Sequence, residues 1–112
     1  MSTKRTIDEI VRAYLAELGK YGMKVDRAYL FGSQARGDAY PDSDIDLLLV
    51  SSAFAEMPVT EQWRILGKAV FALMEPIEPL AYTPEEVQAC LEREGNFIRH
   101  ILHQPETIEY QQ

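Results

Sequence analysis

An unbroken apolar run, LLLV at positions 47–50, is the feature that most constrains how this chain folds. A strand with one face in water alternates apolar and polar residues, whereas a strand buried on both faces reads as continuous apolar sequence. We therefore predict a buried strand over 44–50. Its first residues, Asp44 and Asp46, place two acidic side chains at the start of that apolar strand.

Apolar periodicity predicts helices and short strands around this buried strand. The predicted order is α-β-α-β-α-β-α, which indicates an α/β or α+β fold: a mixed β-sheet with helices packed on it. The first predicted elements are a helix over 7–18 that starts at a Thr6/Glu9 capping box and stops at Gly19, a strand over 25–31, a short helix after Gly32, and the strand over 44–50. A helix over 60–74 follows, capped by Thr60, with one apolar face made of Val59, Trp63, Leu66, Val70, Leu73 and Met74. The last predicted elements are an edge strand over 76–82 that contains Pro79, a helix from Thr83 that breaks at Gly95, a second helical piece, and a final strand over 106–110.

Length and charge narrow the range of functions. With 112 residues we expect one domain over 1–112. The net charge of −7 argues against direct nucleic-acid binding, which normally needs clustered Lys and Arg. The single cysteine, Cys90, cannot form an internal disulfide, and we find no signal peptide and no membrane-spanning segment. We therefore expect a cytoplasmic protein with no membrane partner.

The segment 32–50 carries the residues with most chemical meaning. Strand side chains alternate, so Asp44 and Asp46 are expected to point to the same side. Paired carboxylates there are costly unless a cation neutralises them, and oxygen ligands favour Mg²⁺ or Mn²⁺. Gly32 and Ser33 lie where a strand turns into a short helix, so their backbone is open to a phosphate. We predict a triphosphate there, extending toward metals on the two aspartates.

A third carboxylate would complete a site for in-line displacement with two metal ions. The best candidate is Glu78, on the predicted strand over 76–82. It would bind a metal that activates the attacking hydroxyl or act as the general base itself.

The stretch GSQARGDAYPDSDIDLLLV, at positions 32–50, resembles the signature of DNA polymerase β-type nucleotidyltransferases, and more narrowly of the minimal nucleotidyltransferase (MNT) family. The pattern Gly-Ser, ten residues, Asp-x-Asp is matched at Gly32, Ser33, Asp44 and Asp46. The resemblance implies a polymerase β-like fold, two Mg²⁺ ions per site, and a nucleotide held by Gly32, Ser33 and Arg36.

The resemblance extends over nearly the whole chain. Positions 77–87 are similar to the strand that carries the third carboxylate of the family, and positions 94–110 to its C-terminal end. One residue departs from the pattern: the third carboxylate is usually aspartate, and here it is Glu78. The extra methylene moves the carboxylate oxygens by about a bond length, so it bears on rate more than on assignment.

Family members of this size are commonly antitoxins of HEPN/MNT toxin–antitoxin pairs. The resemblance implies a protein that transfers AMP from ATP to a tyrosine hydroxyl of a partner HEPN toxin and forms a hetero-oligomer with it. Two alternatives remain open: a nucleotidyltransferase that modifies a small molecule, and a non-catalytic antitoxin that neutralises by binding. His100 and His103, three apart on a helix, are interpreted as a solvated face rather than a metal site.

Overall fold

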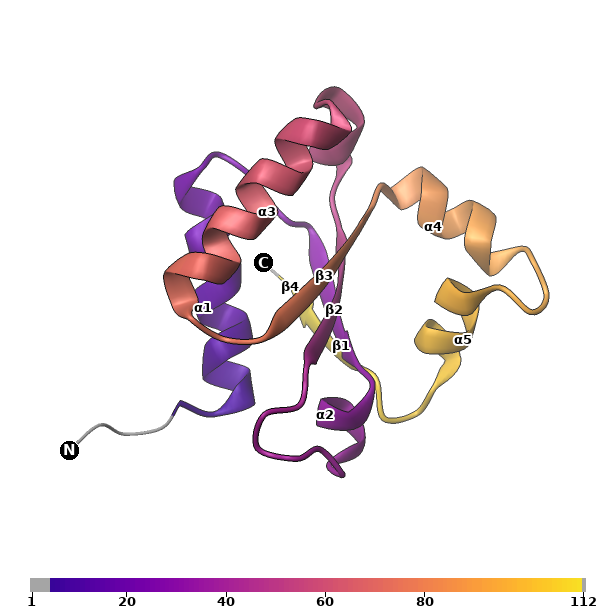
Figure 1. Ribbon diagram of the computed structural model, residues 1–112. Coiled ribbons are helices and arrows are strands. Elements are labelled where there is room, and N and C mark those ends of the chain that lie inside the picture. Colours follow the sequence, from indigo (N-terminus) through magenta and orange to yellow (C-terminus); the bar gives the residue numbers. More distant parts are fainter. Residues whose placement is uncertain (1–4, 112) are drawn as a thin grey trace.

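The computed structural model describes residues 5–111 as a four-stranded mixed sheet with helices on both faces (Figure 1). The strand order is β3-β2-β1-β4; β1 pairs antiparallel with β2 and β4, and β2 pairs parallel with β3. The elements are α1 Ile7–Lys20, β1 Arg27–Phe31, α2 Ser33–Arg36, β2 Ile45–Val50, the 3-10 helix η1 Ser52–Glu56, α3 Val59–Leu73, β3 Ile77–Tyr82, α4 Pro84–Leu91, α5 Phe97–His103 and β4 Ile108–Gln111. The predicted fold class is confirmed, and the predicted alternation of helices and strands holds from α1 to α4, while η1 was not predicted.

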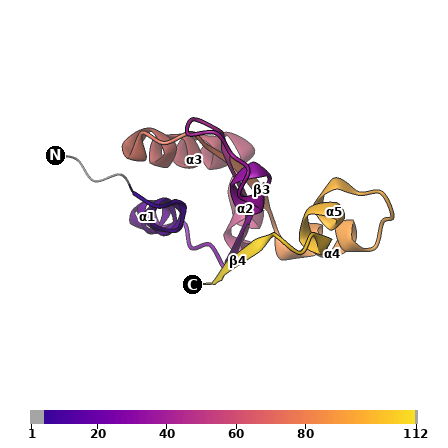
Figure 2. The same cartoon turned by 90° about the horizontal axis from the view of Figure 1, so that it is seen from below.

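The strand β2 is buried on both sides, as its apolar run predicts. Viewed from below, α1 and α3 lie on one side of the sheet and α4 and α5 on the other (Figure 2). Leu47 and Leu49 pack into the cluster with α1 and α3, whereas Leu48 and Val50 pack into the cluster with α5. Since side chains of a strand alternate, Asp46 shares the α4/α5 side with Leu48 and Val50.

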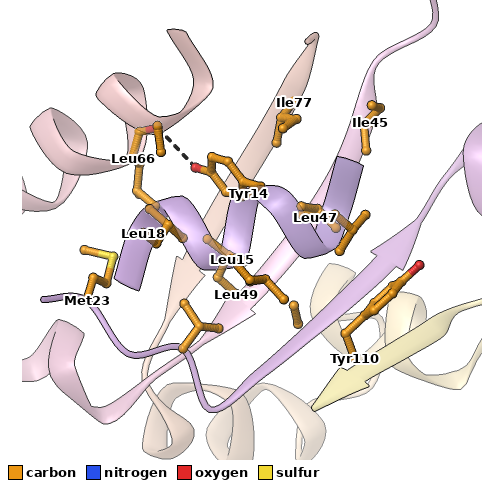
Figure 3. Close-up of a cluster of buried hydrophobic side chains, with 14 of the residues drawn as sticks. Tyr14, Leu15, Leu18, Met23, Ile45, Leu47, Leu49, Leu66, Ile77 and Tyr110 are labelled. Carbon is orange, nitrogen blue, oxygen red and sulfur yellow. Dashed lines mark hydrogen bonds between the residues drawn. The ribbon is translucent and has the colours of Figure 1, made fainter. Parts of the chain in front are cut away.

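The larger core lies between α1, α3 and the sheet (Figure 3). Tyr14 is fully buried there, and its hydroxyl donates a hydrogen bond to the Leu66 carbonyl at 3.1 Å. A buried phenol needs such a partner, because an unpaired polar group in the core is costly. This bond joins the middle of α1 to the middle of α3.

Several local predictions hold. Thr6 with Glu9 forms the predicted capping box at the start of α1, and α4 starts after Thr83 as predicted, with Thr83 and Glu86 forming a second capping box. Strand β3 lies at an edge of the sheet, where Pro79 can be tolerated without the loss of a ladder hydrogen bond.

Other local predictions were wrong. Helix α1 continues through Gly19 to Lys20, because the turn that ends it is made at Gly22, with φ 78°. The N-cap of α3 is Pro58 rather than Thr60, and it makes no side-chain cap hydrogen bond. Strand β1 begins at Arg27, two residues later than predicted.

The predicted apolar face of α3 is only partly buried. The buried residues of α3 are Ile65, Leu66 and Ala69, and only Leu66 belongs to the predicted face. Val59, Trp63 and Met74 of that face are exposed. Apolar spacing alone cannot tell which side of an apolar helix the sheet covers. Within residues 5–111, no helix is both long and apolar enough to span a membrane.

Candidate active site

Two of the three predicted carboxylates lie side by side on neighbouring strands. Asp46 of β2 and Glu78 of β3 are register partners in the parallel pair. Register partners project on the same face, here the side of α4 and α5. Asp44 stands one residue before β2 begins, in an exposed segment. The three acidic residues therefore gather at the end of the sheet where β2 and β3 start.

The pKa values of Asp46 and Glu78 reflect both burial and neighbouring negative charge. Partial burial raises the pKa of Asp46, and the negative charge of Asp44 raises it further, while Arg36 opposes the shift. The pKa of Glu78 is raised chiefly by the charge of Asp44, then by loss of hydration and by Asp46. A hydrogen bond with the Asp44 side chain adds to this shift. Asp46 thus resists ionisation first through burial, and Glu78 first through the charge of Asp44.

Gly32 brings the turn after β1 into contact with the acidic cluster. Its backbone, at φ 78° and ψ −156°, belongs to a region that only glycine adopts readily. A Cβ atom at this position would lie 2.5 Å from Oδ2 of Asp46, so no larger residue fits without moving that carboxylate. The Gly32 carbonyl accepts hydrogen bonds from the backbone N–H groups of Ala35 and Arg36, which fixes α2 directly behind it.

Ser33 and Arg36 belong to the same short helix. Ser33 is half-buried as its first residue, and Arg36 is exposed and forms an ion pair with Asp38 at 3.2 Å. The guanidinium of Arg36 is nevertheless near enough to Asp46 to lower the pKa of that carboxyl. The structure therefore places Gly32 and Arg36, two of the residues predicted to hold a nucleotide, beside a carboxylate predicted to hold metal.

The site opens into two hollows that share the rings of Phe31 and Phe97. Asp46 and Glu78 line one hollow of about 250 Å³, and Gly32 and Arg36 line the other, of about 350 Å³. The two rings meet edge to face, with centroids 6.1 Å apart. Phe97 was not predicted as a site residue, because its place opposite β1 depends on how α5 packs. In sequence it is one more apolar residue of a helix.

The three carboxylates lie near one another but do not form a complete metal-coordination site. Within residues 5–111, no three His, Cys, Asp or Glu side chains are close enough together to hold a metal ion. The donors nevertheless fit a divalent cation, since carboxylate oxygens are the ligands that hard cations prefer. The charge of Asp44 adds to the raised pKa of Asp46 and is the chief cause of the raised pKa of Glu78, and such a cation would relieve this repulsion. His100 and His103 are exposed on α5, as predicted.

Acidic residues lie where β2 and β3 start, beside the Gly32 turn, on a mixed sheet with helices on both faces. This arrangement suits a nucleotidyltransferase. Comparison with protein families bears this out, since residues 8–102 match the family described as nucleotidyltransferase domain. The chain belongs to this nucleotidyltransferase family and is an enzyme of the minimal type. Enzymes of this family generally use divalent metal ions.

The chain is also similar to individual proteins. The putative protein adenylyltransferase MJ0604 of Methanocaldococcus jannaschii is 32% identical over 81 residues, which are 70% of this chain and 78% of that protein. The crystal structure of a putative nucleotidyltransferase from Sulfolobus solfataricus shares the fold, with a TM-score of 0.50, 24% identity, and coverage of 80% of this chain and 84% of that one. A toxin–antitoxin structure with AMP-PNP is more distant, with a TM-score of 0.47, 23% identity, and coverage of 61% and 54%.

Proposed function

We propose that this nucleotidyltransferase transfers AMP from ATP to a tyrosine hydroxyl of a partner protein, a HEPN-type toxin, and thereby acts as its antitoxin. The observation that carries the proposal is the register pairing of Asp46 with Glu78, next to Asp44 and the Gly32 turn. A relative named as a protein adenylyltransferase supports a protein acceptor.

In this proposal Asp44, Asp46 and Glu78 hold two Mg²⁺ ions, with Mn²⁺ as a substitute. When bound, these ions neutralise charge on the transferring phosphoryl group and on the leaving pyrophosphate. Gly32 leaves the backbone open to the triphosphate, because it lacks a Cβ atom. The Ser33 hydroxyl and the Arg36 guanidinium then donate hydrogen bonds to phosphate oxygens.

Glu78 acts on the acceptor. The acceptor oxygen attacks the α-phosphorus, the bond from that phosphorus to the bridging oxygen breaks, and pyrophosphate leaves with the bonding electrons. The tyrosine proton passes to the carboxylate of Glu78. A tyrosine hydroxyl has an ordinary pKa near 10, so it needs a base at neutral pH.

The test is co-expression with the product of the neighbouring gene. The complex is purified and incubated with ATP and Mg²⁺, and the intact mass of each chain is measured. The proposal predicts that the partner gains the mass of AMP and that the modified residue is a tyrosine. Toxin neutralisation with no mass gain would favour an antitoxin that acts by binding alone. Transfer to an added small molecule, with the partner unchanged, would favour the small-molecule enzyme.

A further inference from the structure

The aromatic ring of Phe97 lies between two hollows of the site, and the proposed transfer reaction gives it no role. Phe97 is the first residue of α5, and 59% of its surface is exposed although it lies against Phe31. It lines both the hollow that contains Asp46 and Glu78 and the neighbouring hollow that contains Gly32 and Arg36. The exposed ring of Phe97 lies between the carboxylate cluster and the Gly32 turn, so it is available to stack on a flat ligand.

The second hollow has the size and the chemistry of a small-ligand pocket. Its volume is about 350 Å³, within the range of ligand sites. The Gly32 turn and Arg36 contribute one part of its lining, and Phe97, His100 and Gln104 of α5 and its C-cap contribute another. It therefore combines an aromatic surface with polar groups that donate and accept hydrogen bonds.

We propose that this hollow binds the nucleobase of the nucleotide, with Phe97 as the stacking surface and Gln104 as the group that favours adenine. The inference rests on the proposed function, because it assumes that the triphosphate lies at Gly32 and Ser33. It adds which residues hold the adenine base and favour it over other bases.

Gln104 is held in place for this role. Its backbone N–H donates to the Ile101 carbonyl at 3.2 Å, which anchors the residue at the end of α5. Its amide nitrogen lies 3.3–3.4 Å from the two ring nitrogens of His100, so the side chain is kept beside the hollow. A glutamine amide both donates and accepts, and it pairs with the edge of adenine by two hydrogen bonds.

The charges in the hollow favour a base over a second phosphate group. Arg36 is already paired with Asp38, and the acidic Glu106 belongs to the same lining. A polyphosphate placed deep in this hollow would meet the Glu106 carboxylate, whereas a neutral base would not. The phosphates are better placed at the Gly32 end.

The experiment measures binding by calorimetry in excess Mg²⁺, with ATP, GTP, CTP and inorganic tripolyphosphate as ligands. The variants are Phe97→Ala, Phe97→Tyr and Gln104→Ala. The control is Phe71→Ala, which removes an exposed aromatic ring, 78% exposed against 59% for Phe97, from α3 on the opposite face of the sheet (Figure 2). Thermal unfolding of each variant in EDTA shows whether it is folded.

We expect Phe97→Ala to weaken ATP binding by about 10-fold or more, as loss of one base–aromatic stack does. Phe97→Tyr and Phe71→Ala should keep wild-type affinity. Gln104→Ala should bring ATP affinity down to that of GTP, and none of the variants should change tripolyphosphate binding.

Two results would overturn the inference: unchanged ATP affinity in Phe97→Ala, or an equal loss of ATP and tripolyphosphate binding, which would make the hollow a phosphate site. Failure of the proposed function looks different, because it appears as absence of AMP transfer to the partner by the wild-type protein, whatever the nucleotide affinities of these variants.

Discussion

A Cβ atom on Gly32 would stand 2.5 Å from Oδ2 of Asp46, so the glycine turn and the first strand carboxylate occupy one tightly shared space. Gly32→Ala should displace the Asp46 carboxylate, since a short side chain can turn away. It should also cost about 1–3 kcal/mol of stability, because φ 78° with ψ −156° suits only glycine. We expect lower thermal stability and loss of Mg²⁺–ATP binding by calorimetry.

The control is Gly37→Ala. Gly37 also has a positive φ, 84°, but a Cβ there meets nothing within 4 Å. Its replacement should cost about 1–2 kcal/mol through the backbone alone and leave nucleotide affinity intact. If both variants bound Mg²⁺–ATP like the wild type, the contact between Gly32 and Asp46 would have no part in binding.

Asp46→Asn should stabilise the metal-free protein at neutral pH. The folded chain raises the pKa of Asp46 through burial and through Asp44, so the ionised carboxylate costs stability there. As the pH falls toward the ordinary aspartate value of about 4, the wild-type carboxylate takes up a proton and the difference should vanish. Urea unfolding in EDTA between pH 7 and pH 4 measures this.

Asp42→Asn is the matched control, an exposed aspartate in the segment that leads into β2. It should change stability by less than about 0.5 kcal/mol at any pH. Addition of Mg²⁺ and ATP should raise the melting temperature of the wild type and of Asp42→Asn but not of Asp46→Asn. A neutral-pH stability of Asp46→Asn below that of the wild type would contradict the repulsion described for the cluster.

Tyr14→Phe tests the bond that joins α1 to α3. Loss of the hydrogen bond to the Leu66 carbonyl should destabilise the protein by about 0.5–1.5 kcal/mol at pH 7. Burial raises the pKa of Tyr14, so wild-type stability should fall as the pH rises above about 10, and Tyr14→Phe should escape that fall. Urea unfolding at pH 7 and at a pH above about 10 compares the stability of the wild type with that of Tyr14→Phe. Tyr21→Phe is the control, because Tyr21 is more exposed than Tyr14.

The sequence predicts much of this arrangement because its strongest signals are local. The apolar run over 47–50 implies a strand buried on both faces, and two capping boxes mark the starts of α1 and α4. The contact between Gly32 and Asp46 could not be predicted in this way. It depends on antiparallel pairing of β1 with β2, in which Phe31 lies opposite Asp46.

The positions of Glu78 and Phe97 relative to the site also could not be predicted from the sequence. The strand that carries Glu78 is recognisable, but its register against Asp46 is set by the crossover through α3. Phe97 reaches the site only because α5 packs on the same face of the sheet. The exposure of Trp63 shows the same limit, since helical spacing does not reveal which face of α3 is covered.

Glu78→Gln separates chemistry from binding. It keeps the size of the side chain but removes the group proposed to accept the proton, so AMP transfer should fall by about 10²-fold or more. ATP affinity should stay within several-fold, and pull-down of the partner should be unchanged. Glu78→Asp should retain activity, since it keeps a carboxylate at this place and is the residue that the resemblance to the minimal nucleotidyltransferase family implies. Wild-type transfer by Glu78→Gln would remove Glu78 from the site.

The central claim is that the carboxylates at the start of β2 and β3 transfer a nucleoside monophosphate. The most direct test incubates the protein and its co-purified partner with Mg²⁺ and ATP labelled at either the α- or the γ-phosphate. The account predicts that α-label, and not γ-label, becomes covalently attached to the partner by the wild type and by Asp42→Asn. Asp46→Asn should lose this transfer by orders of magnitude. Attachment of γ-label, or undiminished α-label transfer by Asp46→Asn, would contradict it.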